Sequence, residues 1–535
     1  MTYYYRLARL PQDAEQIHRL NYRTFVEEIP QHDPNDQRQL VDPYHEENTY
    51  LLCMKDGELA GMIALRDARP FSLDRKIGPI EQSLNNPPER PVEIRLLAME
   101  PEHRTGRPFF GILQALVNWC LKKGYDAAVI SGTVRELKLY RRLGFKPFAE
   151  PVGTEQAKYV PMILSRESYE GSAAGRLATP MVNLLPGPAA ISENVRRALA
   201  EEPISHRSPA FTRLLGSVKR QLTDLTGAAY VHVLQGTGTL ANDAVAAQLS
   251  RIDGKGLILV NGEFGRRLLD HAERMGLEFV AFETQDGQVF PMKEIGRQLD
   301  QGAFDWLWFV HCETSTGVLN DMDTISQICR DEGVKVAVDC ASSLGTVPLD
   351  LRIVDFASSV SGKGLAGYSG LALVFHNGRL EEDRRLPRYL DIGLYEEGGG
   401  IPFTQSSNLL AALDQALRNL SVDPDRRYGQ LRRTADRLRK GAGTLGISVL
   451  ASEESASPGI LTFVLPPGRS AQRLGDDLFL NGFRTHYESG YLLEHNWLQA
   501  AVMNGPDDRE TDRFLAVLAK LSDCETLSSA APYEY

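Results

Sequence analysis

Short apolar runs rich in β-branched and aromatic residues recur through the middle of the chain, and this pattern limits the possible folds more than any other feature. Segments with the apolar period of an amphipathic helix, such as MDTISQICRDEG, lie between most of the runs. Strands that alternate with helices form mainly parallel sheets covered on both faces. The sequence therefore predicts a large α/β domain whose strands are residues 230–234, 256–260, 278–282, 306–310, 335–339 and 370–375.

The rest of the chain divides around that sheet. With 535 residues the chain is too long for a single core, and its length predicts roughly two to four domains. A stretch rich in Gly, Ser and Ala, without a sustained apolar period, predicts an interdomain linker. We expect an α+β domain over 1–165, a linker over 166–182, the large domain over 183–390 and a small α+β lobe over 391–535.

Composition and charge exclude several classes of function. Hydrophobic residues make up 42% and charged residues 24%, as in a globular protein. The net charge of -11 argues against a broad basic surface for nucleic acid or anionic membrane. No apolar run approaches the roughly 18 residues that cross a bilayer, and the amino terminus lacks an apolar signal core. We expect a cytoplasmic protein that acts on small molecules, with neither nucleic acid nor membrane as a partner.

The cysteines predict neither a disulfide framework nor a zinc site. The six of them are scattered and form no CxxC pair. We therefore expect reduced, buried thiols and no metal centre.

The loop SVSGKGLAG, residues 359–367, places one lysine, Lys363, among residues with almost no side chain. A lone lysine in such a loop is ordinarily a solvated charge, so any function must be argued from its companions. Four other segments also follow predicted strands, and open α/β sheets bind ligands beyond the carboxyl ends of their strands. They are LQGTGT (234–239), NGEFGRR (261–267), HCETSTG (311–317) and AVDCASSLG (337–345).

Each of these segments offers one part of a cofactor site: backbone N–H groups that cradle a phosphate, a stacking ring, a hydroxyl donor and a carboxylate. In that order the residues are Thr237, Gly238 and Thr239, then Phe264, Thr314 and Asp339. With the lysine they are the parts that hold pyridoxal 5'-phosphate (PLP). Asp339 would keep the pyridine nitrogen protonated and Lys363 would form the Schiff base. We expect the small residues around Lys363 to let the cofactor approach its amine.

Residues 181 to about 525 resemble the class V aminotransferases, in particular 2-aminoethylphosphonate–pyruvate and alanine–glyoxylate transaminases. The shared motifs are LLPGP, SHRSPAF, LQGTGT, NGEFGRR, HCETSTGVL, VDCASSLG and SGKG. The resemblance implies fold type I of the PLP-dependent transferases, with Lys363 as cofactor attachment and later acid and base. It implies Asp339 on the pyridinium, Thr314 on the ring oxygen and Phe264 stacked. It also implies that Thr404, in IPFTQSSN, reaches the phosphate of a neighbouring subunit, and hence a homodimer.

The sequence departs from that family at two positions. Gly362 precedes the lysine where relatives often carry a polar residue, which removes one cofactor contact. Gln499 stands nearest the position of the arginine that clamps a substrate carboxylate, and Arg484 is a candidate replacement. We therefore expect a substrate that lacks a free α-carboxylate or is held through other groups, with alanine and glyoxylate as poor substrates.

The first domain resembles GNAT acyltransferases, through VEIRLLAMEPEHRTGRPFFGILQALVNWCLKKGYDAAVISG and YRRLGF. The resemblance implies that Arg104, Gly106 and Arg107 grip the pyrophosphate of an acyl-CoA, either acetyl-CoA or a longer one. It implies that Tyr140 protonates the departing thiolate. Two further segments are similar to acyl-homoserine-lactone and N-acyl amino acid synthases: residues 21–32 and 46–66.

The two resemblances predict a bifunctional enzyme. Its carboxyl half would transaminate an amine or amino acid with a keto acid, and its amino half would acylate an amine. An alternative is a PLP-dependent lyase, racemase or β/γ-replacement enzyme, since class V folds host several reactions. In that alternative the GNAT-like domain is a structural or metabolite-binding module. A regulator or scaffold that binds a metabolite without turnover is the alternative outside enzymes.

Overall fold

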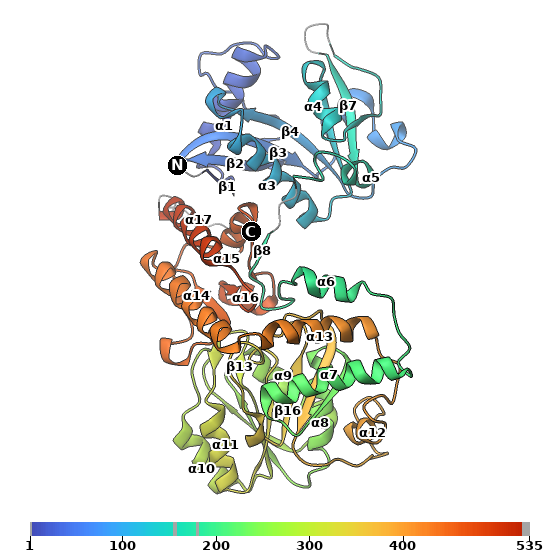
Figure 1. Ribbon diagram of the computed structural model, residues 1–535. Helices are drawn as coiled ribbons and strands as arrows, with labels where there is room; N and C mark the ends of the chain where they lie inside the picture. The colour runs from blue at the N-terminus through green and yellow to red at the C-terminus, as the bar shows by residue number, and fades with distance from the viewer. Residues whose placement is uncertain (1–2, 154–157, 178–180, 527–535) are drawn as a thin grey trace. The chain divides into compact units, whose positions relative to one another are not determined.

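The computed structural model describes residues 3–153, 158–177 and 181–526 (Figure 1). The described chain forms two compact units. The carboxyl-terminal unit consists of Asn183–Pro467 and Thr485–Leu515. The amino-terminal unit consists of the chain up to Val182, Gly468–Arg484 and the chain from Ala516 onward. No helix within the described ranges is long and apolar enough to cross a membrane.

A seven-stranded sheet organises the carboxyl-terminal unit, in the order β11-β10-β12-β15-β16-β17-β9. All pairs from β11 to β16 are parallel, whereas β17 is antiparallel to both of its neighbours. The expected mainly parallel sheet is confirmed. Its strands are β9 (Tyr230–Gly236), β10 (Gly256–Val260), β11 (Phe279–Glu283), β12 (Trp306–Val310), β15 (Lys335–Asp339), β16 (Phe356–Val360) and β17 (Gly370–His376). The run pattern missed β16 because two serines interrupt its apolar residues.

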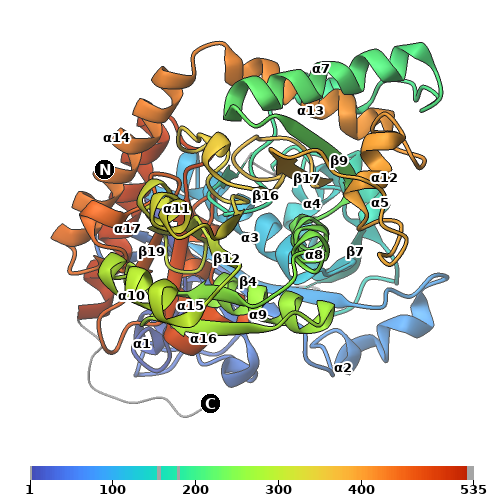
Figure 2. The ribbon, with the colours of Figure 1, turned by 90° about the horizontal axis from the view of Figure 1, so that it is seen from below.

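Helices cover both faces of this sheet and bury it. Apolar side chains of α7, α10, α11 and α13 form one core with β9, β17 and the central strands. Side chains of α8, α9 and α12 form the second core on the opposite face. Figure 2 shows α7 and α13 side by side on one side of β9 and β17, with α8 on the other. The helices are α7 (Pro209–Thr226), α8 (Gly238–Leu249), α9 (Glu263–Met275), α10 (Met292–Gly302), α11 (Met322–Asp331), α12 (Ile392–Glu397) and α13 (Ser407–Ser421).

A smaller antiparallel sheet, in the order β18-β19-β21, completes the unit. Its elements and the helices beside it are β18 (Ser448–Val449), β19 (Ile460–Val464), β21 (Trp497–Ala501), α14 (Pro424–Thr444) and α16 (Gly490–His495). The expected lobe over 391–535 differs from this arrangement, because Gly468–Arg484 belongs to the amino-terminal unit. Within that segment, α15 (Ala471–Leu480) buries Leu480 in the amino-terminal core, and the Asn481 amide bonds the backbone N–H and C=O of Tyr5 at 3.0 and 2.6 Å.

The amino-terminal unit is built on a second seven-stranded sheet, in the order β1-β2-β3-β4-β5-β7-β6. Only the start of β4 pairs with β5, in parallel, through Pro91, Val92 and Glu93. Beyond Glu93 the two strands separate, as the GNAT resemblance implies. The strands are β1 (Tyr4–Leu7), β2 (Thr49–Lys55), β3 (Glu58–Arg66), β4 (Pro91–Met99), β5 (Ala127–Thr133), β6 (Lys146–Pro147) and β7 (Tyr159–Ser165).

Helices α1 (Ala14–Tyr22), α3 (Arg107–Lys123) and α4 (Leu137–Arg142) accompany this sheet. The expected linker begins with a short helix, α5 (Arg166–Glu170), which a capping box of Ser165 and Ser168 opens. The stretch up to Val182 is therefore counted with the amino-terminal unit.

Candidate active sites

Lys363 lies in the loop that joins β16 to β17, and its side chain is half-buried. Its Nζ atom donates to Ser342 Oγ at 3.0 Å and lies 5.2 Å from the centroid of the Phe264 ring. Ser342 Oγ in turn lies 2.5 Å from Thr314 Oγ1. Burial lowers the pKa of Lys363, whereas the Asp339 carboxylate acts to raise it. The structure thus brings the lysine, the ring and the hydroxyl of the sequence prediction together, and it raises the fraction of neutral amine.

Asp339 ends β15 with a buried carboxylate whose direction is fixed. Its oxygens accept hydrogen bonds from Asn242 Nδ2 at 2.9 Å and from the backbone N–H of Ala341 at 2.7 Å. Asn242 lies on α8, and its own Oδ1 accepts from Ser358 Oγ on β16 at 2.5 Å. Sequence reasoning missed Asn242, although it lies in LQGTGTLANDAV, a few residues beyond the predicted phosphate cradle.

The N-terminus of α8 presents an open set of backbone donors. Thr237 is the N-cap and Gly238 is the first helical residue. The side chains of Thr237 and Thr239 are exposed, and no side-chain cap occupies the first N–H groups. A Cβ added at Gly238 would meet only Val360, at 4.0 Å. Such a helix end binds anions, because its N–H groups lack intrahelical partners and the helix dipole favours negative charge.

Phe264 is held in place by a buried acid that sequence reasoning missed. The Glu313 carboxylate accepts from the backbone N–H groups of Phe264 at 3.3 Å and Gly265 at 3.0 Å. It also accepts from Ser315, at 3.0 Å from the backbone and 2.6 Å from the hydroxyl. Burial raises the pKa of Glu313. A Cβ at Gly262 would lie 2.5 Å from Glu313 Cγ, so this contact explains the first glycine of NGEFG.

The glycines around Lys363 are required by packing against the protein. A Cβ at Gly364 would lie 2.3 Å from the carbonyl oxygen of Leu344, and one at Gly362 would lie 2.3 Å from Ser369 Oγ. The expectation that small neighbours serve the approach of a cofactor needs correction at these two positions. Gly187, from LLPGP, lies against the lysine itself, since its Cβ would be 3.4 Å from Lys363 Cγ.

Gln499 is fully buried on β21, and its amide hydrogens are engaged by protein acceptors. Nε2 donates to the carbonyl oxygens of Thr314 at 2.7 Å and Ser315 at 2.9 Å, and to Thr462 Oγ1 at 2.8 Å. An amide has two N–H groups, so none is left for a substrate carboxylate. Arg484 is exposed at the end of β20 (Phe483–Arg484) and is counted with the amino-terminal unit. Thr404 is exposed, in the segment between α12 and α13.

The predicted acyl-donor residues lie at the start of α3. Gly106 is the N-cap with φ of 70°, a conformation that favours glycine, and Arg107 is exposed. The Arg104 guanidinium is already paired with Glu28, and its Nε donates to the carbonyl of Met99 at 2.9 Å. Tyr140 is half-buried on α4, and burial raises the pKa of its hydroxyl.

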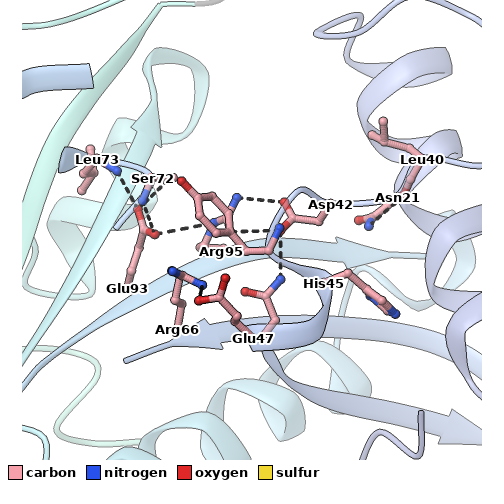
Figure 3. Close-up of polar contacts among 12 residues, drawn as sticks. Asn21, Leu40, Asp42, His45, Glu47, Arg66, Ser72, Leu73, Glu93 and Arg95 are labelled. Carbon is pink, nitrogen blue, oxygen red and sulfur yellow. Dashed lines mark hydrogen bonds and ion pairs between the residues drawn. The ribbon is translucent and has the colours of Figure 1, made fainter. Parts of the chain in front are cut away.

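The same unit contains a cluster of charged side chains that sequence reasoning missed (Figure 3). Asp42, Arg66 and Glu93 are buried, Arg95 is half-buried and Glu47 is exposed. Arg95 of β4 donates to both oxygens of Asp42, at 3.0 and 2.8 Å. Arg66, at the end of β3, pairs with Glu47 at 2.6 Å and is 1% exposed. Burying charges is costly unless they are paired, so such a concentration needs a reason.

Glu93 extends this cluster along β4, where Glu93 and Arg95 point to the same face. Its carboxylate accepts from the backbone N–H of Ser72 at 2.9 Å, from Ser72 Oγ at 2.6 Å and from the backbone N–H of Leu73 at 3.1 Å. Its Oε2 lies 3.6 Å from Arg95 Nε. The signal that could have revealed the cluster is the pair of charges two residues apart in the otherwise apolar strand VEIRLL.

Comparison with known proteins decides the family. The model of the aminotransferase class-V family matches residues 190–388. A 2-aminoethylphosphonate–pyruvate transaminase of Pseudomonas fluorescens is 31% identical over 305 residues, which are 54% of this chain and 82% of that protein. Its counterpart in Pseudomonas putida is 32% identical over 301 residues, 53% and 81% of the two chains. The chain belongs to the class V aminotransferases.

Solved structures agree with this assignment. The alanine–glyoxylate aminotransferase of Nostoc sp. superposes with a TM-score of 0.60 at 26% identity, over 64% of this chain and 96% of that one. The ureidoglycine–glyoxylate aminotransferase of Bacillus subtilis, at 22% identity and a TM-score of 0.61, supports the fold alone. The carboxyl-terminal unit therefore has fold type I of the PLP-dependent transferases.

The amino-terminal part matches a second family. The model described as N-acyl amino acid synthase FeeM covers residues 16–166. The GNAT-like fold expected for this part is confirmed, and the chain joins an aminotransferase domain to an N-acyltransferase domain.

The residues of the class V aminotransferase site fit PLP. The open helix end suits its phosphate, the buried and doubly hydrogen-bonded Asp339 suits a protonated pyridine nitrogen, and Lys363 has a neutral fraction raised by burial.

We predict that Gly364→Ala weakens PLP binding, because the added Cβ would displace the loop that carries Lys363. Overpacking of this kind costs about 1–3 kcal/mol. The measurement is the PLP content and unfolding temperature of the purified variant. Gly378→Ala is the matched control, since a Cβ there meets nothing within 4 Å. Equal PLP content in the two variants would contradict the prediction.

We predict that Asp339→Asn retains PLP but reacts slowly, because a neutral amide does not stabilise a protonated pyridine nitrogen. The expected loss in kcat is on the order of 10²-fold, the scale seen when one preorganised electrostatic contact is removed. Stopped-flow absorbance of the bound cofactor measures it. Asp355→Asn is the control, since Asp355 pairs with Lys335 at the opposite end of β15. Unchanged turnover in Asp339→Asn would remove this carboxylate from the site.

We predict that neutralising Arg104 and Arg107 together weakens binding of acyl-CoA, with Arg107→Gln contributing more. Arg104 is paired with Glu28, whereas Arg107 is exposed. Loss of an exposed ion pair corresponds to about 0.5–1 kcal/mol, or about a two- to fivefold higher Kd. Calorimetric titration at low and high salt checks this, with the exposed Arg166→Gln as control. Equal affinity in all variants would remove the start of α3 from the donor site.

Proposed function

We propose that the two domains act in sequence. The aminotransferase domain converts a carbonyl compound into a primary amine, and the N-acyltransferase domain caps that amine as an amide. The presence of both family matches on one chain, over 16–166 and 190–388, is the observation that carries this proposal. Acylation removes the free amine and so prevents its return to the carbonyl compound.

In the aminotransferase domain, PLP would supply an electron sink for the carbon that carries the amine. Asp339 would hold the ring nitrogen, and the first N–H groups of α8 would hold the phosphate. Lys363 Nζ would accept the proton from the substrate carbon and return it, since its pKa is lowered by burial. Ser342 Oγ, bonded to both Nζ and Thr314 Oγ1, would orient the amine of Lys363 between these steps.

The proposed product of this domain is a primary amine whose anionic group is not an α-carboxylate. The relatives named 2-aminoethylphosphonate–pyruvate transaminases support an aminoalkylphosphonate. In this chain the amide donors of Gln499 are engaged by Thr314, Ser315 and Thr462, so this residue has no N–H for a carboxylate. An amino acid would donate the nitrogen and leave as a keto acid, so its carboxylate would be held by a residue other than Gln499.

In the acyltransferase domain, the cluster of Asp42, Arg66, Glu93 and Arg95 would bind the acceptor amine and its polar substituents. The amine nitrogen would attack the thioester carbonyl carbon as its proton passes to a carboxylate of the cluster. The carbon–sulfur bond breaks, and Tyr140 would protonate the thiolate that leaves. An acyl-CoA is the proposed donor.

We also propose that the enzyme is a cytoplasmic homodimer. The exposed side chain of Thr404 supports a contact with the cofactor phosphate of a partner subunit. The cysteines whose side chains the structure describes are all free thiols, which suits a reducing compartment.

We predict complementary failures of two variants. The full-length enzyme, given a phosphonoaldehyde, a panel of amino donors and acetyl-CoA, should form the N-acyl amine, detected by mass spectrometry. Lys363→Ala should form it only when the amine itself is added. Tyr140→Phe should accumulate the free amine, with acylation slowed by about 10²–10⁴-fold, the range of general acid catalysis.

The outcome of that experiment also separates the alternatives. Amine formation without any acylation by the unaltered enzyme would make the first domain a binding module. Loss of the amino group from the added amine without transfer to a keto acid would indicate a lyase.

We predict that 2-aminoethylphosphonate reacts with the bound cofactor about tenfold faster than alanine, or more. Gln499 offers alanine no partner for its carboxylate, and each 1.4 kcal/mol of missing interaction corresponds to about a factor of ten. Gln499→Arg should improve the reaction with alanine. A guanidinium has five N–H donors, so it can satisfy the three acceptors around Gln499 and still bond a carboxylate. Single-turnover absorbance measures both reactions. Efficient use of alanine and glyoxylate by the unaltered enzyme, undiminished in Arg484→Ala, would contradict this prediction.

A further inference from the structure

Two histidines and a glutamate meet at the edge of the large sheet, away from the residues assigned to PLP. His232 is on β9, His376 ends β17, and Glu396 is on α12. Both histidines are buried, with 2% and 1% of their surfaces exposed, and the glutamate is half-buried. One potential ligand atom from each lies within 4.8 Å of the others. His232 and His376 are 144 residues apart, so no short spacing motif revealed the group.

The distance between the two rings suits a shared ion. His232 Nε2 and His376 Nε2 are 3.1 Å apart. With metal–nitrogen bonds of about 2.0–2.1 Å, two nitrogens at that separation subtend an angle of about 100° at the ion. This angle lies between the octahedral and tetrahedral values. A carboxylate oxygen within 4.8 Å needs only a side-chain adjustment to complete a third bond.

The tautomer of His376 is already that of a metal ligand. Its Nδ1 lies 2.6 Å from the carbonyl oxygen of Gly378, and a carbonyl can only accept, so Nδ1 carries the hydrogen. In the neutral ring the lone pair is then on Nε2, which faces His232. Metal-bound histidines are commonly fixed in this way by an outer carbonyl. Tyr230 stacks on the His376 ring at 4.9 Å and further fixes its plane.

The neutral imidazole is the form that binds metal. His232 Nδ1 is buried and has no hydrogen-bond partner, so no contact at Nδ1 fixes the tautomer of this ring. Glu396 accepts from the backbone N–H of Leu380 at 3.1 Å through Oε2, which leaves its other oxygen for an ion.

We propose that His232, His376 and Glu396 bind one divalent transition-metal ion of the zinc type. Two imidazoles and one carboxylate are ligands that zinc takes, and water can complete the coordination. The ion would tie α12 to β9 and β17 and thereby fix the start of the segment that leads to Thr404. The site is structural, since no residue assigned to PLP or substrate is among its ligands.

The test is the zinc content and zinc affinity of the full-length holoenzyme, purified without a histidine tag. We expect one zinc per chain by mass spectrometry of the metal, and an unfolding temperature that falls on chelation and recovers with Zn²⁺ but not with Mg²⁺. His232→Gln and His376→Gln should lose the metal. The control is His495→Gln, which changes an exposed histidine of the same unit.

Because changes at buried histidines can prevent folding, Glu396→Gln is the second variant. It retains both imidazole rings. Loss of a residue that only hydrogen-bonds a metal ligand weakens metal affinity by roughly 10- to 100-fold, so loss of a direct ligand should weaken Zn²⁺ binding by more than this. Lys219→Met removes a neighbouring positive charge and should tighten binding. No bound zinc above the level of His376→Gln, or an equal response of all variants to Zn²⁺, would overturn the proposal.

Discussion

Parallel pairing of β15 with β12 and β16 is the constraint on which the aminotransferase site depends. In that register Val310, Asp339 and Ser358 lie side by side. The three strands end at one edge, and the loops that follow them carry Thr314, Ser342 and Lys363. If β15 slipped by one residue in this register, each of its side chains would point to the opposite face of the sheet. The Asp339 carboxylate would then lie away from Asn242.

Buried hydrogen bonds hold the loops at this edge of the sheet in one arrangement. Asn242 bridges Asp339 and Ser358, and Glu313 joins the loop after β12 to the first turn of α9. Gln499 extends the same principle, because its amide holds the carbonyl groups of Thr314 and Ser315. Unpaired buried groups are costly, so each bond restricts the loops to one arrangement. Hydrogen bonds of Asn242, Glu313 and Gln499 thus fix the loops that surround Lys363, although none of these three residues bonds the lysine itself.

The sequence was sufficient for features that a local pattern encodes. Apolar runs located all but one strand of the large sheet, and glycine-rich strand ends pointed to Lys363 and Asp339. Features that depend on contacts across the chain were not predictable. Asn242 and Asp339 are 97 residues apart, and His232 and His376 are 144 apart. The serines of β16 hid a strand, and the glycines beside Lys363 were ascribed to the cofactor because their packing partners, such as Leu344, are distant in sequence.

The chain passes between its two units four times, after Val182, Pro467, Arg484 and Leu515. Removing residues beyond the linker would strip α15 and its Leu480 from the core of the amino-terminal unit. An amino-terminal fragment that stops at residue 182 would therefore lack part of its own core. Because both family matches lie on one polypeptide, the cell makes the two domains in equal amounts.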